Sequence, residues 1–302
     1  TEIEISILER LDFGFDGVFD PFTIDDVYSY SGDFGFITNS TPERDSTSFY
    51  GQGTWNHSDS LRTVFGLRHT NDEVYSAVTN FYGRSGTDIL ETDGNKVTGR
   101  FVIEKDIDDN TMVFGSFTRG YKPGGSNLTY GREDTVAQIV VLPTFQEEIV
   151  DAFEVGLKTD LAGGRVRLNT AAFLYNYEGL QYQATDPEVF EGGVGNIPDS
   201  EIFGAELELS AFLSDDVILD LRMSWLDTEI TADHLALDNV ESESATNALL
   251  AQGIGLFSND VQIARAGRIQ NVRGNELAKT PSFTGNVALN WTDDLNSGEL
   301  KG

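Results

Sequence analysis

The alternating stretch 202–213, IFGAELELSAFL, decides the fold, together with 217–227, VILDLRMSWLD, which follows it after Ser-Asp-Asp. In both segments every second residue is apolar, and the residues between are mainly Gly, Glu, Ser, Asp and Arg. Side chains that alternate with a period of two lie on opposite faces of a β-strand. Because only 214–216 separates the segments, the sequence predicts an antiparallel hairpin with one apolar and one polar face.

The short turn also predicts the register of this hairpin. If the turn is centred on Asp215, residues whose numbers have the same sum face each other, so Glu208 is opposite Arg222 on the polar face. Opposite charges across an antiparallel pair contribute about 0.2–1 kcal/mol, and a wet surface keeps the value near the lower end. We therefore expect this pair to fix register more than to add stability. The same centring pairs Ser210 with Asp220 and Glu206 with Ser224.

Other segments show similar alternation or a strand-like composition, namely 48–56, 61–70, 97–105, 111–121, 150–160, 165–178 and 283–291. With weaker signals inside 1–36, they give about ten strands. The alternation persists for longer than a soluble strand of about 5–6 residues requires. Together with 31 Gly, 20 Phe, 10 Tyr and only 7 Pro, this pattern predicts an all-β protein.

The connections between these strands are of two alternating kinds. Short, mostly polar ones are expected at 57–60, 106–110, 161–164, 214–216 and 292–294. Long, irregular ones are expected at 71–96, 122–148, 185–200 and 231–280. A β-sandwich has no reason to place all short turns at one end, whereas a membrane barrel does. We therefore expect part of an antiparallel transmembrane β-barrel, with short periplasmic turns and long extracellular loops.

The residues also carry the membrane signal expected of strands. No stretch approaches the roughly 20 apolar residues of a membrane helix, but a barrel strand needs only about 9–11 alternating residues. Trp55, Trp225 and Trp291 lie on the apolar face near predicted strand ends, as an aromatic girdle at the membrane boundary would. The alternative is a sandwich core. Ionisable residues at consecutive positions of the opposite face favour a wet lumen instead.

The charge of the chain excludes some classes of partner. A formal net charge of -30 and a pI near 4.2 argue against a nucleic-acid-binding protein. The acidity is consistent with a solvated secreted surface, or with acidic loops outside a membrane that recruit divalent cations. With no cysteine, the chain has neither disulfides nor thiol chemistry.

Neither catalysis, a metal site nor a cofactor is expected. Closely spaced carboxylates occur at Glu206/Glu208, Asp227/Glu229 and Asp151/Glu154. The first pair has a spacing that a hydrolase could use, but solvated lumen charges explain it equally well. The histidines show no metal-ligand spacing; they are His57, His69 and His234. The run 106–110 resembles the start of a calcium loop but lacks its Gly and Glu. We predict that the protein is not an enzyme.

Five longer motifs carry a family resemblance. They are FYGQGTWNHSDSLRTVFGLRHTND (49–72), SFTRGYKPGGSN (116–127), EEIVDAFEVGLKTDLAGGRVRLNTAAFLYNYEGLQ (147–181), GNIPDSEIFGAELELSAFLSDDVILDLRMSWLDTEI (195–230) and TPSFTGNVALNW (280–291). In this order they resemble the C-terminal barrel of TonB-dependent outer-membrane receptors. The resemblance implies a Gram-negative outer-membrane protein surrounded by lipid. It also implies uptake of a scarce ligand, such as a ferric siderophore, cobalamin or oligosaccharide, by a plugged barrel energised through TonB.

The resemblance also sets the expected extent of the domain. A barrel of this family has about 22 strands, so about ten strands are under half of one. No plug domain, TonB box or terminal strand is found, and the sequence begins at Thr1 without Met. We expect 1–302 to be a fragment of the barrel domain, with the TonB complex binding a missing N-terminal region. The alternatives are a small passive porin-type barrel and a secreted β-sandwich binding module or enzyme.

Aromatic and polar residues of the long loops are the candidates for ligand binding, because recognition usually resides in loops on a rigid scaffold. They are Tyr121, Lys122, Asn127, Tyr130, Tyr182 and Phe190, to which we add the unpaired lumen residue Glu206. The alternative for the loop residues is that they anchor the loops or lie at the membrane boundary.

Overall fold

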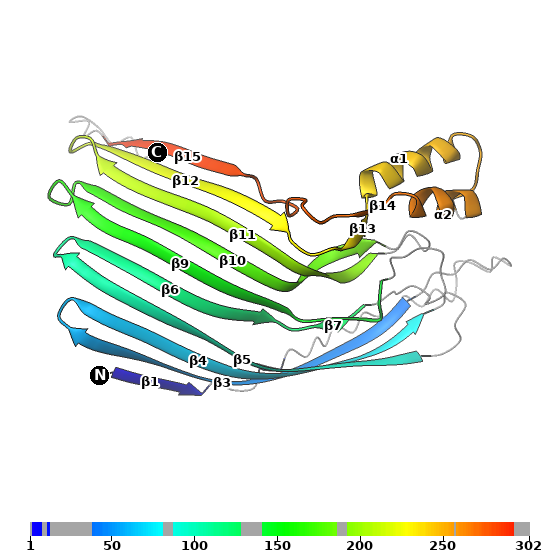
Figure 1. The fold of residues 1–302 in the computed structure, drawn as a ribbon, viewed down its shortest axis with the longest axis horizontal. Helices are drawn as coiled ribbons and strands as arrows, with labels where there is room; N and C mark the ends of the chain where they lie inside the picture. Colours follow the sequence, from blue (N-terminus) through cyan, green and yellow to red (C-terminus); the bar gives the residue numbers. More distant parts are fainter. Residues whose placement is uncertain are drawn as a thin grey trace, which may run out of the picture.

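A computed structural model describes residues 2–7, 11–12, 38–80, 87–127, 141–185, 192–256 and 258–292. Its main element is one antiparallel sheet of eleven strands, in the order β1-β3-β4-β5-β6-β9-β10-β11-β12-β15 with β2 paired to β3 (Figure 1). The strands are β1 Glu2–Ile7, β2 Leu11–Asp12, β3 Thr38–Ser58, β4 Leu61–Asn80, β5 Thr87–Asp108, β6 Thr111–Lys122, β9 Glu148–Leu161, β10 Val166–Thr185, β11 Gly192–Phe212, β12 Val217–Ile230 and β15 Phe283–Trp291. The predicted all-β barrel wall of about ten strands is confirmed.

Short turns join neighbouring strands at one end of the sheet, on the left in Figure 1. They lie at 59–60, 109–110, 162–165 and 213–216, as predicted, whereas 293–294 lie outside the described residues. In the turn after β9, Ala162, Gly163 and Gly164 all have positive φ. Glycine adopts that conformation without steric cost, so the Gly-Gly pair permits this tight reversal.

The strands reach further from the turns than the sequence predicted. The expected loop 71–96 is mostly strand, because β4 continues to Asn80 and β5 starts at Thr87. Likewise, 192–200 belongs to β11. The physical reason is that these extensions mix polar and apolar residues on both faces, so the alternation that marks a half-buried strand is absent there. Hydrogen-bonded pairing with the neighbouring strand holds them extended.

The expected irregular loop 231–280 contains secondary structure of its own. A ribbon of β13 Leu235–Leu237 and β14 Ile269–Asn271 carries two helices, α1 Asn239–Leu250 and α2 Asn259–Ala266 (Figure 1). The side chains of Asp238 and Ser258 cap the helix N-termini by accepting hydrogen bonds from backbone N–H groups. No helix in the described parts of the chain is both long and apolar enough to cross a membrane.

The register predicted for the β11–β12 hairpin is confirmed. Glu208 is paired with Arg222, and their charged groups are 3.8 Å apart. Both side chains are more than half exposed, so the pair contributes little to stability. Leu209 faces Leu221 on the other side of the sheet, which confirms the predicted separation of apolar and polar faces.

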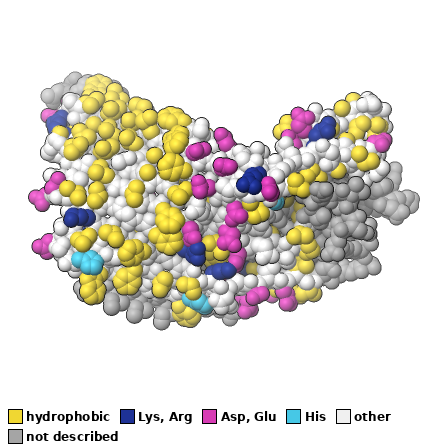
Figure 2. All heavy atoms as spheres, in the orientation of Figure 1, with side chains coloured by type: hydrophobic (Ala, Val, Ile, Leu, Met, Phe, Trp, Pro, Cys, Tyr) yellow, Lys and Arg dark blue, Asp and Glu magenta, His cyan; other side chains and the backbone are white. Residues whose placement is uncertain are grey.

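We call the apolar face the one formed by odd-numbered residues, and on β10 by even-numbered ones. Its large side chains are exposed rather than packed against a second layer, including Leu67, Val155, Val287, Leu289 and Trp291, each more than 60% exposed. Figure 2 shows hydrophobic side chains gathered over the part of the sheet nearer the short turns. A sandwich would bury this face. Its exposure argues for contact with lipid.

The apolar face ends abruptly on the side away from the turns. Phe101, Phe117 and Phe153 form one cross-strand row, with 5.0 Å between the ring centroids of the last two. In the next row, Arg119 and Asp151 are paired by charge. On β12 the apolar positions run from Val217 to Trp225, about 27 Å along the strand and about 20 Å after tilting. This is close to the ~25 Å apolar band of membrane barrels.

Candidate functional site

The opposite surface, the polar face, carries charged side chains along its whole length. Near the turns, Arg62 donates to Glu104 at 2.5 Å and to Asp106 at 3.0 Å. Arg167 donates to both carboxylate oxygens of Asp160, at 2.8 and 3.2 Å. Charged side chains can pair across strands in water, whereas moving them into lipid would cost a large desolvation free energy. This face therefore borders an aqueous space.

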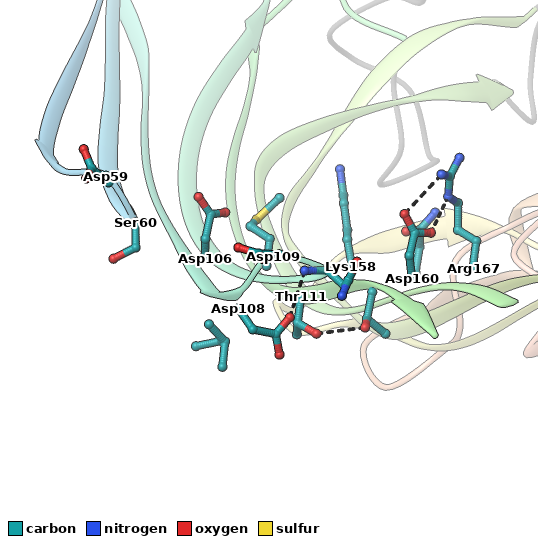
Figure 3. Close-up of a pocket in the computed structure, with 14 residues that line it drawn as sticks. Asp59, Ser60, Asp106, Asp108, Asp109, Thr111, Lys158, Asp160 and Arg167 are labelled. Atoms are coloured by element: carbon teal, nitrogen blue, oxygen red, sulfur yellow. Dashed lines mark hydrogen bonds and ion pairs between the residues drawn. The ribbon is translucent and has the colours of Figure 1, made fainter. Parts of the chain in front are cut away.

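A hollow of about 760 Å³ lies at the turn end of the sheet, bordered by the β5–β6 turn and by β9 and β10. Figure 3 shows the Arg167–Asp160 pair there, with Lys158 and Asp106 further along the curved sheet. The Lys158 ammonium lies 5.6 Å from the centre of the Phe114 ring. The hollow is open and polar, and the described residues bring together no group of three metal-ligating side chains.

At the other end of the sheet, the chain folds back across the polar face. Residues 123–127 and 141–147, which include β7 Gly125–Ser126 and β8 Thr144–Phe145, form what we call the inner ribbon. Side chains tie one of its sides to β4 and β5. Ser126 donates to Ser76 at 2.6 Å, and Lys96 pairs with Glu147. Tyr121, at the end of β6 just before the ribbon, donates to Asp72 of β4.

Side-chain amides tie the inner ribbon to β10 and β11. Gln181 donates to the carbonyl oxygens of Pro123, at 2.9 Å, and Gln146, at 3.1 Å. Asn196 donates to the Gln146 carbonyl at 3.0 Å and accepts from the Gln146 N–H at 2.8 Å. These amides satisfy backbone groups that have no sheet partner. The inner ribbon is therefore fixed to both walls of the polar face.

Close approach of the backbone supports the same junction. Gly179 has φ +68°, and a Cβ at this position would lie 2.5 Å from the Glu147 carbonyl oxygen. Its own carbonyl accepts from Asn196 at 2.7 Å. Only a glycine meets both demands, the left-handed conformation and the space.

Asp72 joins β4 to β3 and to the end of β6, from which the ribbon leaves, and only 2% of the residue is exposed. Burial alone would raise the pKa of this carboxyl. Hydrogen bonds from Tyr121, Ser46 and Arg44 outweigh that effect, and the pKa of Asp72 stays below its usual value. Burial and the hydrogen bond to Asp72 raise the pKa of the Tyr121 phenol. Both groups therefore stay in the charge state that the contact needs.

The structure divides the predicted site residues into engaged and free groups. The Tyr121 hydroxyl is used by Asp72. The Asn127 side chain is buried, donates to the carbonyl oxygens of Leu142 and Val194, and accepts from the Val194 N–H. Asn127 thus anchors the inner ribbon, and Tyr121 anchors the end of β6 beside it. Anchoring was the alternative weighed for the loop residues.

Tyr182 anchors a second loop. Its hydroxyl shares a hydrogen bond of 2.9 Å with Nε2 of His234, and the two rings meet edge to face. Burial lowers the pKa of His234 and raises that of Tyr182. The contact attaches the helical loop 231–280 to β10.

Two predicted residues have free polar groups. Lys122, at the end of β6, and Glu206, on the polar face, are exposed and form no ion pair within the described ranges. Tyr130 and Phe190 lie outside the described residues.

Sequence reasoning missed most of the anchors, namely Asp72, Ser76, Gln181 and Asn196. These side chains bind backbone or hydroxyl groups far away in sequence, and no local spacing marks them. The only hint of these anchors in the sequence is the polar residues of the segments that extend the strands.

Comparison with known proteins gives a consistent result. A family model described as "TonB dependent receptor-like, beta-barrel" matches residues 6–301. The ferric yersiniabactin uptake receptor FyuA from Yersinia pestis aligns with a TM-score of 0.58 and 18% identity, over 86% of this chain and 33% of that one. The siderophore receptor PiuA from Acinetobacter baumannii gives 0.59 and 16%, over 83% and 32%.

A third structure, the ferripyoverdine receptor of Pseudomonas aeruginosa, aligns with a TM-score of 0.51 and 12% identity, over 84% of this chain and 27% of that one. At these sequence identities, the three structures show that the chain has a similar fold. The chain spans about a third of the length of the first two structures and less of the third.

Proposed function

Because this chain belongs to the TonB-dependent receptor-like β-barrel family of Gram-negative outer membranes, we propose that it forms part of the barrel of an active transporter. The receptor takes up a scarce ligand with energy supplied through TonB. We propose further that the plug domain and the TonB-binding segment belong to other parts of a longer protein, and that this part carries no catalytic activity.

The two-faced sheet is the observation that carries this proposal. One face of the sheet carries an exposed apolar band about as tall as the membrane. On the side away from the turns, this band ends at charged residues such as Arg119 and Asp151. The other face holds ion pairs and the inner ribbon. A sheet with lipid on one side and an aqueous lumen on the other explains both surfaces.

A siderophore-type ligand is the substrate class that we favour, since the similar structures are named as receptors for ferric yersiniabactin, a siderophore and ferripyoverdine. Lys122 beside the inner ribbon and Glu206 deeper in the lumen supply the free polar contacts. Lys122 forms no ion pair with its register partner Glu148, whose carboxylate accepts from the backbone N–H of Gln181.

Uptake by the full-length receptor in its own host tests the proposal. Cells would be starved of iron and given radiolabelled iron bound to a panel of siderophores. Deletion of the gene should abolish uptake of one siderophore, and loss of TonB should abolish the same uptake. Uptake that continues without TonB would indicate a passive barrel instead, and no uptake defect with any siderophore would exclude this ligand class.

Lys122→Gln and Glu206→Gln are expected to weaken uptake of that siderophore by raising the concentration needed for half-maximal rate. Glu208→Gln is the matched control, because Glu208 lies two residues from Glu206 on the same face and is already paired with Arg222. Equal effects of all three substitutions on uptake would exclude a specific role of Lys122 and Glu206 in binding the siderophore.

A further inference from the structure

Two arginines lie side by side on the lumen wall without a carboxylate. Arg68 on β4 is in register with Thr98 on β5, and Arg100 follows Thr98 by two residues on the same face. Such diagonal neighbours have Cα atoms about 7–8 Å apart, within reach of two long side chains. Within the described parts of the chain, neither guanidinium forms an ion pair.

Arg68 is held in place by hydroxyl groups. Its Nε donates to Thr70 Oγ1 at 3.1 Å, and its Nη2 donates to Ser48 Oγ at 2.7 Å. Ser48 and Thr70 are both buried, with 8% and 6% of each residue exposed. The guanidinium is thus oriented by neutral partners, which fix its position but leave its charge uncompensated.

The absence of a carboxylate is unusual for this wall. The chain has 50 acidic residues against 20 Lys and Arg. Five other cations of the same face are paired with carboxylates, namely Arg44, Arg62, Lys96, Arg167 and Arg222, and Lys158 lies over the Phe114 ring. Two adjacent, unpaired positive charges repel each other, and an anion between them would relieve that repulsion.

We propose that Arg68 and Arg100 form an oxyanion site on the lumen wall, between the turns and the inner ribbon. Arginine suits this role because its planar guanidinium donates two parallel hydrogen bonds to a carboxylate. Further donors share its two rows of the sheet, since Tyr50 is in register with Arg68 and Thr118 with Arg100. The ligand is a carboxylate or a related oxyanion.

Such a group can come from two sources, a dissolved anion that enters the lumen or a carboxylate side chain from another part of the same receptor. The site rests on the proposed function only in that this face lines the lumen. Binding is measured on the isolated receptor, so the inference stands or falls separately from TonB-driven uptake.

The test uses the full-length receptor in detergent at low ionic strength, with citrate as the probe and titration calorimetry as the measurement. Arg68→Gln combined with Arg100→Gln is expected to weaken citrate binding at least tenfold, about 1.4 kcal/mol. Arg222→Gln, a paired arginine of the same face, is the control and should leave citrate binding unchanged.

If an internal carboxylate fills the site, citrate does not bind to the wild-type receptor. In that case the double variant should lower the midpoint of thermal unfolding at low salt, with a smaller loss at high salt and none for Arg222→Gln. Either result supports the oxyanion site and identifies its source. A double variant that matches Arg222→Gln in both measurements would overturn it.

Discussion

The half of the sheet beside the short turns and the half beside the loops consist of the same strands, yet different forces hold them. In the first half, the strands present Leu, Val and Phe to lipid and charged pairs to the lumen. In the second half, which lies beyond the apolar band, the inner ribbon covers part of the polar face, and order comes from polar side chains such as Asp72, Gln181 and Asn196. The comparison shows that the solvent around each half decides which residues stabilise it.

The largest expected effect comes from a charge on the lipid side of the first half. Leu209→Arg or Leu221→Arg should destabilise the full-length receptor by about 2–4 kcal/mol if the residue lies near the bilayer midplane. Unfolding in lipid bilayers would measure the loss. The control is Ser210→Lys, which adds a charge to the opposite face of the same strand. A similar loss for the control would mean that the apolar face is not distinguished by lipid.

A smaller effect is expected from the anchor of the second half. Asp72→Asn should cost about 1.5–3 kcal/mol, because hydrogen bonds to a charged group contribute that much. Hydrogen exchange should become faster in β7 and the adjoining ribbon, while β11 and β12 stay protected. Glu73→Gln changes the neighbouring carboxylate on the other face and should leave exchange in β7 unchanged. Faster exchange throughout the sheet would contradict a local anchor.

The pH dependence of this anchor follows from the same charge. The pKa of Asp72 is lower in the folded protein than its usual 3.8. Its contribution is therefore fully present above pH 3.8 and is lost as the pH falls through the lowered folded value. Exchange rates in β7 measured on a descending pH series should show this loss in the wild type and not in Asp72→Asn. Identical profiles would exclude Asp72 as the titrating group.

Loss of the anchor at the other end of the inner ribbon should destabilise the protein less. Asn127→Ala leaves the Val194 backbone groups without their amide partner, which should cost about 1–2 kcal/mol. The readout is proteolysis of the ribbon in the folded receptor, with Asn95→Ala on exposed β5 as the control. If both variants resist protease like the wild type, Asn127 does not hold the ribbon.

The smallest effect is expected at the contact between the helical loop and β10. Burial keeps the pKa of His234 below 6.5 in the folded state, so protonation is disfavoured there. The loop contact is unaffected above pH 6.5 and weakens as the pH falls below it, because the unfolded loop binds the proton more readily. Fluorescence of a probe on α2 should report loop release at acid pH, and His234→Gln should abolish the pH dependence. Release with the same pH profile in both proteins would exclude His234.

The sequence predicted the first half well because lipid imposes a period of two. The hairpin, its register and the Glu208–Arg222 pair all followed from alternation in 202–227. Most of the second half, such as 71–96, was predicted as loop because residues such as Asn71 and Asp72 interrupt the period of two, although they lie in paired strands. Which of its polar side chains are anchors depends on contacts between strands, so Tyr121 and Asn127 were assigned to ligand binding from their loop position alone.

The exposure of 206–209 to lipid or water tests the central distinction most directly. The chain has no cysteine, so single cysteines can be introduced here once any others in the full-length receptor have been replaced. Nitroxide labels at Glu206, Leu207, Glu208 and Leu209 would be compared in bilayers for collision with oxygen, which concentrates in lipid, and with a water-soluble nickel complex. We expect oxygen to dominate at Leu207 and Leu209 and nickel at Glu206 and Glu208. Collision rates without this two-residue alternation would contradict a sheet that separates lipid from an aqueous lumen.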